Sequence, residues 1–447
     1  MTSLQGTHGK SNFRTFLHEH KAILILMAVL FIERVLLLYH LGLTYTLDSD
    51  DMSYVISGIT FAKTGVVSMH GEYPSAQIMP GMTWLIGAFV LVFGEGKLLW
   101  AALKLLWIIW GTLTAWFIYR SICMFAPKWC GVVASLPLLG AEFAWMDNLI
   151  LTETPFMCSF AAMIYFTLRM GKRQDNISFW GCLIAYMTGL MLKANIAIYP
   201  LFAMVYLLIV KYDRKKLLKQ IVIVACAVLC FEIPWCARNM KQFDAFIPLT
   251  YGAGNPTLLG TYQGIRYPTD ESLDYETNVT DVVKEKYAQY YDENGNVLPQ
   301  YSKYIDLRSD GIKANYRLRV WAERDMKSLI YSYGFLKPLS IINDTFYWDN
   351  AFYVSADTVS NLQRLNTILC VCAVIAALVL KRNRQQILFL AILYMGNVMI
   401  YAMTFAFGRY NASLMPARYI LLGISISLFV EAILIGVKQT QQFLTKE

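Results

Sequence analysis

The amino-acid sequence predicts an all-α, polytopic membrane protein with about ten (10–11) transmembrane helices. Hydrophobic residues make up 57% of the 447 residues and charged residues only 16%, whereas a soluble globular chain carries roughly 25% charged residues. The mean hydropathy is +0.43. The apolar residues come in long runs, and a helix needs about 20 of them to cross about 30 Å of hydrocarbon. This composition excludes a disordered, collagen-like or nucleic-acid-binding protein.

The apolar runs give the predicted spans in order along the chain. They are 22–41, 98–119, 129–147, 155–169, 176–192, 195–210, 217–236, 362–380, 385–407 and 414–437. The first run is longer than the apolar region of a signal peptide and no small-x-small cleavage site follows it, so we expect it to remain as the first anchor. The stretch 80–93 is too short to span comfortably. We expect it to form a juxtamembrane or re-entrant helix on the outer side.

Basic residues predict the orientation, because they gather on the cytoplasmic side of membrane proteins. The strongest cluster is Lys211, Arg214, Lys215, Lys216 and Lys219. With ten spans this cluster and those at 120–128, 169–173 and 381–384 all lie inside, as do both termini. Counting 80–93 as a span would put Arg120 and Lys128 outside.

This topology places all the long loops on the outer face and divides the chain into three parts. They are an N-terminal transmembrane module (1–236) that includes the first outer loop (42–97), a large extracytoplasmic loop (237–361), and the last three helices (362–447). The large loop is rich in Tyr and is expected to carry amphipathic helices near 279–291 and 312–331. Its aromatic residues favour a small core over a sugar-stacking surface. We expect a multi-pass protein of the cell membrane that works extracytoplasmically.

An acidic cluster follows the first span. Asp48, Asp50 and Asp51 lie within four positions. In a structural interpretation Asp48 caps a helix and the other two occupy its first turn, where the helix dipole favours them. In a functional interpretation Asp50 and Tyr54 share a helix face, and Asp50 is a general base toward a hydroxyl.

A second acidic site, Leu151-Thr152-Glu153-Thr154-Pro155, is predicted on the same outer side. Glu153 either caps the next helix or faces Asp50 and Asp51 across a site. Converging carboxylates could also hold a divalent cation through oxygen ligands. No other cofactor is indicated. The nine Cys residues contain no CxxC pair, so the sequence signals neither a zinc site nor a disulfide scaffold.

Cations near the outer membrane edge are few: Lys193, Arg238, Arg409 and Arg418. A phosphate bound at the bilayer surface would need such residues. Alternatively, each anchors a helix end by reaching toward the lipid headgroups. Glu33 and Arg34, within the first span, point about 100° apart on a helix and are not an obvious pair. Glu142 and Glu232 are intramembrane acids to which the sequence assigns no role.

Five segments, in order, resemble motifs of the C-type membrane glycosyltransferases, specifically the protein O-mannosyltransferase and aminoarabinose-transferase superfamily (glycosyltransferase family 39-like). Asp50-Asp51-Met52-Ser53-Tyr54 resembles its Asp-Glu-x-x-Tyr motif, and Thr152-Glu153-Thr154-Pro155 its Thr-Glu-Pro turn. The others are Pro80-Gly81-Met82-Thr83-Trp84-Leu85, Pro234-Trp235-Cys236-Ala237-Arg238-Asn239, and Arg409-Tyr410 followed by Met415-Pro416. Three departures stand out: Asp51 replaces the usual Glu, Gln77-Ile78-Met79 precedes the second motif, and Thr154 is inserted in the turn.

The resemblance implies a GT-C fold and a reaction. A sugar would move from a polyprenyl-phosphate donor to a hydroxyl at the outer face, with inversion. Asp50 would be the general base, joined by Asp51 and Glu153 as catalytic carboxylates. The implied substrate contacts are Tyr54, Lys193, Arg238, Arg409 and Tyr410.

Two other functions stay open at this point. A transporter or flippase of a lipid-linked saccharide would call for paired interrupted helices and charges along a path. A membrane-anchored binding or assembly protein would use the large outer loop, but it gives no reason for carboxylates at the membrane edge. Glycan, lipid and protein acceptors all remain possible partners beside the bilayer itself.

Overall fold

The computed structural model describes residues 14–69, 71–348 and 351–444, with side chains as far as Val430. Within these residues every regular element is a helix, and one isolated bridge joins Tyr291 and Val297. The chain is therefore the predicted all-α, multi-pass membrane protein.

Six helices of the described chain are long and apolar enough to cross a membrane. They are α2 (Lys21–Leu41), α5 (Lys97–Ile122), α11 (Arg214–Phe243), α16 (Ala356–Leu380), α17 (Arg384–Ala402) and α18 (Gly408–Leu444). In α18 the apolar stretch is 408–430.

The other four predicted spans are also helical, but they are shorter, interrupted or more polar. They comprise α6 (Lys128–Ser135), η1 (Leu136–Leu139) and α7 (Ala141–Met146); α8 (Glu153–Arg173); α9 (Asn176–Leu192); and η2 (Ala194–Ile198) with α10 (Tyr199–Ile209). The span expected at 129–147 is broken because Gly140 is extended, with φ −64° and ψ 143°. Six spans thus follow from length and hydropathy, and the count of ten stays a prediction.

Polar residues set the helix starts at the end of the bundle that carries the basic clusters. Asp175 accepts the N–H of Ser178 at 2.6 Å and caps α9. Asp213 accepts the N–H of Lys216 at 2.7 Å and caps α11. Both carboxylates satisfy N–H groups that the first turn of a helix leaves without partners.

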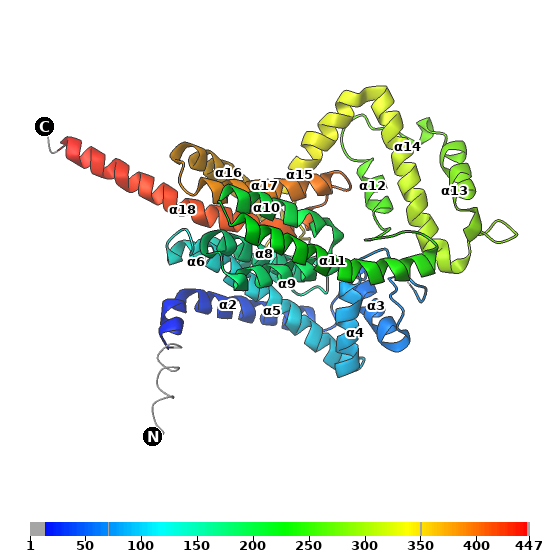
Figure 1. Ribbon diagram of the computed structural model, residues 1–447, viewed down its shortest axis with the longest axis horizontal. Helices are drawn as coiled ribbons and strands as arrows, with labels where there is room; N and C mark the ends of the chain where they lie inside the picture. The colour runs from blue at the N-terminus through cyan, green and yellow to red at the C-terminus, as the bar shows by residue number, and fades with distance from the viewer. Residues whose placement is uncertain (1–13, 70, 349–350, 445–447) are drawn as a thin grey trace, which may run out of the picture.

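The long connections lie together at the opposite end of the bundle. Figure 1 shows the helices of the outer loops at the right, while α18 runs out to the left. These helices are α3 (Asp50–Thr64), α4 (Gly81–Phe93), α12 (Gly254–Gly260), α13 (Asp281–Lys286) and α14 (Ser302–Tyr331). α15 (Lys337–Asn343) leads back to the bundle. The stretch expected to be a juxtamembrane helix is α4, which has 13 residues.

The large outer loop has its own small aromatic core. The rings of Phe243, Tyr251 and Tyr304 lie 5.1–5.3 Å apart, and Tyr290 packs 5.5 Å from Tyr304. These side chains are buried, so they form the small core that we expected in preference to a sugar-stacking surface. The stretch expected to be helical near 279–291 is helical, but in three short pieces: η4 (Glu276–Thr280), α13, and η5 (Ala288–Tyr290). α14 begins at Ser302, well before the expected residue 312.

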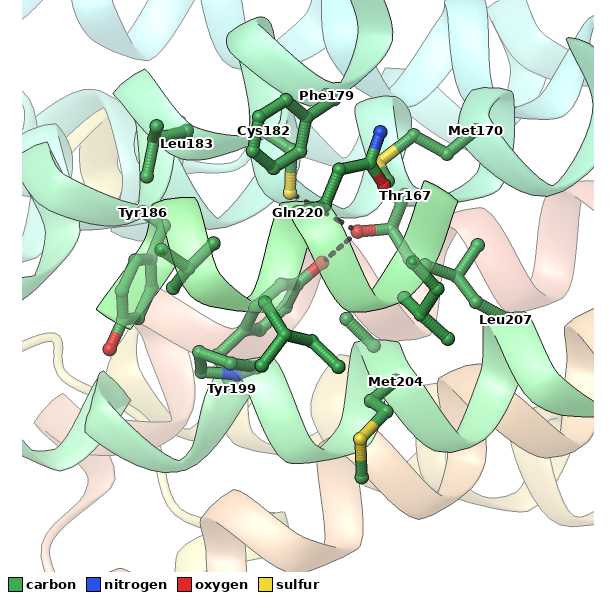
Figure 2. Close-up of a pocket in the computed structure, with 15 residues that line it drawn as sticks. Thr167, Met170, Phe179, Cys182, Leu183, Tyr186, Tyr199, Met204, Leu207 and Gln220 are labelled. Carbon is green, nitrogen blue, oxygen red and sulfur yellow. Dashed lines mark hydrogen bonds between the residues drawn. The ribbon is translucent and has the colours of Figure 1, made fainter. Parts of the chain in front are cut away.

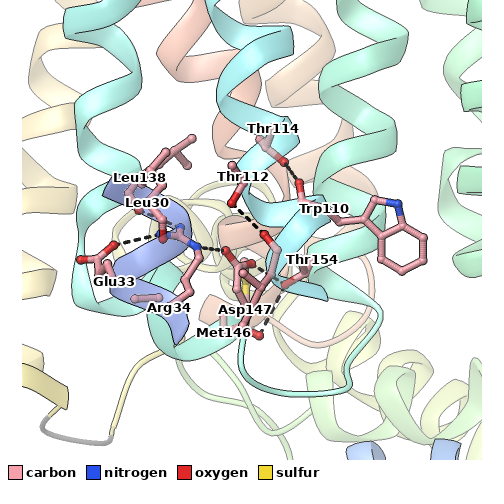
Figure 3. A network of polar contacts seen from close by, with 12 residues as sticks. Leu30, Glu33, Arg34, Trp110, Thr112, Thr114, Leu138, Met146, Asp147 and Thr154 are labelled. Atoms are coloured by element: carbon pink, nitrogen blue, oxygen red, sulfur yellow. Dashed lines mark hydrogen bonds and ion pairs between the residues drawn. The ribbon is translucent and has the colours of Figure 1, made fainter. Parts of the chain in front are cut away.

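A buried polar network ties α2 to the start of α8 (Figure 3). Arg34 Nε lies 2.6 Å from Asp147 Oδ2 and Arg34 Nη1 lies 2.9 Å from Glu33 Oε2. Glu33 and Arg34 therefore do pair, because the long guanidinium side chain curls back along the helix. Thr154, the inserted residue of the turn motif, donates to Asp147 Oδ1 at 2.7 Å. The network fixes the segment that carries Glu153.

A second intramembrane acid also gains a structural role. Glu142 accepts the backbone N–H of Phe346 at 3.1 Å and the Nε2–H of Gln363 at 3.0 Å. It thereby joins α7 to the end of the large outer loop and to α16. Arg418, also buried, donates to the carbonyls of Ile342 and Gln363 and is an internal brace.

Candidate active site

The turn before α3 is built around Asp51. The Asp51 carboxylate is fully buried and accepts the backbone N–H groups of Leu47 at 2.7 Å, Ser49 at 3.2 Å and Met52 at 2.9 Å. The prediction that Asp48 caps the helix is wrong, because the N-cap residue is Ser49 and no side chain makes a capping hydrogen bond. Asp48 is exposed and has a positive φ of 50°. Asp51 therefore fixes the turn that presents Asp50.

Asp50 and Tyr54 lie one helical turn apart and line a cavity of about 560 Å³. Its wall comes from the first outer loop, from the starts of α8 and η2, from the large outer loop, and from the α17–α18 junction. The Asp50 side chain is 42% exposed. The carboxylate thus stands at an open cavity at the end of the bundle that carries the long connections.

Four charged groups alternate along one wall of this cavity. Arg409 Nη1 lies 2.7 Å from Asp50 Oδ2, and Arg409 Nε lies 2.8 Å from Glu153 Oε1. The same Glu153 oxygen lies 2.7 Å from Lys193 Nζ. The order is Asp50, Arg409, Glu153, Lys193, so each buried charge faces an opposite one.

The pairing decides the protonation of the buried members. Burial alone would raise the pKa of Glu153, but Arg409 and Lys193 outweigh it and hold that pKa at about 2. Burial lowers the pKa of Lys193, and Glu153 opposes part of the shift. Burial, with help from Asp50, raises the pKa of Tyr54. At neutral pH Glu153 is ionised and Tyr54 keeps its proton.

Aromatic rings flank the cations. Lys193 Nζ lies 5.3 Å from the ring centre of Phe156 and 5.9 Å from that of Tyr410. Tyr410 stacks on Tyr401 with centroids 4.3 Å apart and planes 8° apart. These contacts hold Lys193 at the cavity wall through cation–π attraction.

The structure brings together Asp50, Tyr54, Glu153, Lys193, Arg409 and Tyr410, all of which line the cavity. It does not bring Arg238 there. Arg238 donates to the carbonyl of Ser75 at 2.9 Å and to that of Val67 at 3.0 Å, and so braces the first outer loop. Asp51 is likewise occupied by backbone N–H groups.

Several polar lining residues were not among the predicted site residues, and Gln77, Asn195 and Lys303 are examples. Gln77 belongs to the stretch that precedes the Pro-Gly motif, and its Oε1 is buried without a hydrogen-bond partner among the described residues. Its place before that motif was the signal that could have found it. Lys303 lies at the start of α14, before the helix expected at 312–331, and no pattern in the sequence pointed to it.

The predicted carboxylates do not form a ready cation site. Asp51 faces backbone N–H groups, and Glu153 faces two cations. The described residues contain no group of three or more His, Cys, Asp or Glu side chains arranged to hold a metal ion.

Another cavity, between α8, α9, α10 and α11, is chemically different (Figure 2). Its volume is about 100 Å³ and no charged side chain lines it. Its polar contacts are internal, because Thr167 Oγ1 lies 2.8 Å from Tyr199 Oη and 3.4 Å from Cys182 Sγ. An ionic substrate would find no partner there, so the charged cavity is the candidate active site.

Comparisons with known proteins bear on the family and the fold of the chain. Residues 75–235 match the family described as dolichyl-phosphate-mannose-protein mannosyltransferase. No curated protein matches the chain. The Archaeoglobus fulgidus oligosaccharyltransferase, in complex with zinc and sulfate, aligns with a TM-score of 0.52 and 13% identity, over 94% of this chain and 51% of that one. The same enzyme in complex with an inhibitory peptide and a dolichol-phosphate aligns with a TM-score of 0.50 and 13% identity, over 95% of this chain and 52% of that one.

ArnT from Cupriavidus metallidurans in the apo state gives a TM-score of 0.41 and 14% identity, over 90% of this chain and 77% of that one. Because that score is below 0.5, the fold assignment rests on the archaeal enzyme, whose chain is matched over about half its length. The predicted resemblance to C-type membrane glycosyltransferases is confirmed by the family match and by the shared fold.

Proposed function

We propose that this protein transfers a sugar from a polyprenyl-phosphate donor to an acceptor hydroxyl at the outer face of the cell membrane, with inversion at the sugar carbon. The observation that carries the proposal is the contact of Asp50 with Arg409 on the wall of an open cavity, at 2.7 Å. The matched family is described by a lipid-phosphate sugar donor. One solved relative is a complex with a dolichol-phosphate.

Asp50 is the general base of this proposal. Its carboxylate is part of the cavity wall and is partly open to it. It takes the proton of the acceptor hydroxyl while that oxygen forms a bond to the anomeric carbon. The bond between that carbon and the phosphate oxygen breaks, and its electron pair leaves with the phosphate. Attack opposite the leaving group inverts the configuration.

Lys193 and Arg409 stabilise the phosphate in this proposal. A donor phosphodiester carries one negative charge, and the departing polyprenyl phosphate gains a second. Ammonium and guanidinium groups are the usual partners of such oxygens, and fixed charges at a developing anion act with little reorganisation. The phosphate therefore leaves without needing protonation.

Glu153 and Tyr54 act beside them. Glu153 is buried, ionised and paired with both cations, which suits it to hold Lys193 and Arg409 in place and not to exchange protons. Tyr54 keeps its hydroxyl proton and is a hydrogen-bond donor toward the substrate. Tyr410 offers a ring face beside Lys193. Asp51 acts indirectly, by fixing the turn.

The test is transfer itself. The purified protein in lipid nanodiscs is incubated with a panel of radiolabelled polyprenyl-phosphate sugars and with extracted glycans, lipids or peptides as acceptors. We expect one donor to be consumed, with label moving to an acceptor hydroxyl and free polyprenyl phosphate appearing in equal amount. NMR of the product should show the anomeric configuration opposite to that of the donor. Movement of intact donor across a sealed vesicle, without cleavage, would support a flippase instead.

A further inference from the structure

A second cavity adjoins the active-site cavity within the large outer loop. Its volume is about 280 Å³, and its wall is formed by α12, by the end of α13 and by α14. Thr250, Ala253 and Leu307 line both cavities. The two spaces therefore meet at a shared wall. The second cavity is therefore a neighbour of the cavity that Asp50 lines.

Close packing of α12 on α14 produces this arrangement. A side chain at Gly254 would overlap the backbone carbonyl of Leu307, and Gly311 approaches Gly254 from the facing helix. The contact brings Ala253 and Leu307 to the boundary between the cavities. The absence of a side chain at Gly254 is thus required for the shape of the second cavity.

The charge of this second cavity is unbalanced. Lys286 and Arg308 line it, and none of its lining residues is Asp or Glu. Arg308 makes no hydrogen bond or ion pair among the described residues, although it lies at the cavity wall. Two cations that no acidic side chain of the wall balances favour an anionic ligand in this cavity.

Arg317, on the same helix α14, is an arginine whose guanidinium donates to acceptors inside the loop. Arg317 is fully buried and donates to Thr261 Oγ1 at 2.7 Å, to Asp270 Oδ1 at 2.5 Å and to the Pro268 carbonyl at 2.7 Å. The loop can therefore provide internal acceptors where an arginine is structural. Arg308 has no comparable internal acceptor among the described residues and lines the second cavity.

We propose that the second cavity is the acceptor site, and that the acceptor is an anionic saccharide whose carboxylate or phosphate group binds Arg308 and Lys286. The proposal rests on the transferase function proposed above and names its acceptor class. The rest of the lining suits a sugar, because hydroxyls and an amide (Thr250, Thr257, Asn315) lie beside the ring of Tyr287. Such groups bond sugar hydroxyls, and the ring packs on a sugar face.

The experiment measures binding, so that it is independent of the transfer reaction. The full chain in nanodiscs is titrated with four probes: a disaccharide ending in a hexuronic acid, one ending in a hexose 6-phosphate, the matched neutral disaccharide, and an acidic peptide. We expect at least one anionic disaccharide to bind roughly tenfold tighter than the neutral one, because charged hydrogen bonds are worth more than neutral ones. The preference should shrink as salt is raised.

Variants place the binding in the cavity. Arg308→Gln and Lys286→Gln should each weaken binding of the anionic disaccharide roughly tenfold and leave the neutral one unchanged. Arg319→Gln is the matched control, because Arg319 is an exposed arginine of α14 that lines neither cavity. If Arg308→Gln fails to fold, Lys286→Gln carries the test, since Lys286 is exposed on α13.

The outcomes separate this inference from the proposed function. Equal affinity for charged and neutral disaccharides, binding of the acidic peptide alone, or unchanged affinity in both variants would overturn the anionic acceptor site. Sugar transfer to a neutral acceptor would then still stand. Tight, Arg308-dependent binding in a protein that cleaves no lipid-linked sugar would support the site and refute the transferase.

Discussion

The guanidinium Nη1 of Arg409 lies 2.7 Å from the carboxylate of Asp50, although 359 positions separate the two residues in the chain. Asp50 belongs to the first outer loop and Arg409 begins the last apolar helix. The contact brings residues from the two ends of the sequence together on one wall of the proposed active-site cavity. It also joins the proposed base to a proposed phosphate ligand, so the two roles are coupled in space.

Replacing Asp50 tests the proposed base. Asp50→Asn keeps the size of the side chain but removes the group that accepts the proton, so we expect sugar transfer to fall by about 10²–10⁴-fold. Asp48→Asn is the matched control, since Asp48 lies in the same turn, is exposed and does not line the cavity. Transfer from purified Asp50→Asn within a few-fold of the natural protein would refute the assignment.

Replacing Arg409 tests the proposed phosphate contact. Arg409→Gln removes a cation that touches both Asp50 and Glu153, and we expect the KM for the lipid donor to rise more than the KM for the acceptor. Steady-state kinetics with each substrate varied in turn provide the measurement. Arg364→Gln, an exposed residue of α16, should change neither. An effect confined to the acceptor would contradict the role.

Lys193 should set an alkaline limit on activity. Burial lowers its pKa below that of a free lysine, and only the protonated form can bind phosphate. Activity should therefore be full below this pKa and be lost as the pH rises through it. Lys193→Arg should move the loss to higher pH, because a guanidinium stays charged, while Lys193→Gln should be impaired at every pH. The pH dependence of kcat/KM is the readout; identical alkaline limbs for Lys and Arg would argue against the assignment.

The Arg34–Asp147 pair should be strongly coupled in stability. Both side chains are fully buried, so Arg34→Met alone strands a buried carboxylate and should cost roughly 3–5 kcal/mol. Adding Asp147→Asn should recover part of that loss, because the stranded charge is gone. Unfolding in mild detergent, measured for both single variants and the double variant, gives the coupling energy. Strict additivity would mean that the contact contributes nothing.

The sequence predicted those parts of the site that depend on local spacing and on sidedness. Asp50 and Tyr54 line one cavity because they are a helical turn apart. Glu153, Lys193 and Arg409 meet them because membrane topology puts all of these residues at one end of the bundle. These facts follow from periodicity and from the distribution of basic residues.

The roles of similar residues could not be separated in advance. Arg238 and Arg409 both follow apolar runs at the outer edge, yet the folded first loop offers carbonyls to Arg238 and carboxylates meet Arg409. Asp50 and Asp51 are neighbours, but a turn with φ +50° at Asp48 sends one to backbone N–H groups and the other to the cavity. Such differences depend on loop conformations that involve distant parts of the chain.

One oxygen of Glu153 serves both Lys193 and Arg409, and this has a consequence for biosynthesis. While the ribosome is still making the last third of the polypeptide, Glu153 can have only the nearer of its two cations. The site reaches charge balance only when the final apolar helix has been inserted and has docked. A nascent chain should therefore be unable to carry out the proposed transfer prematurely, so that activity itself would report completed assembly.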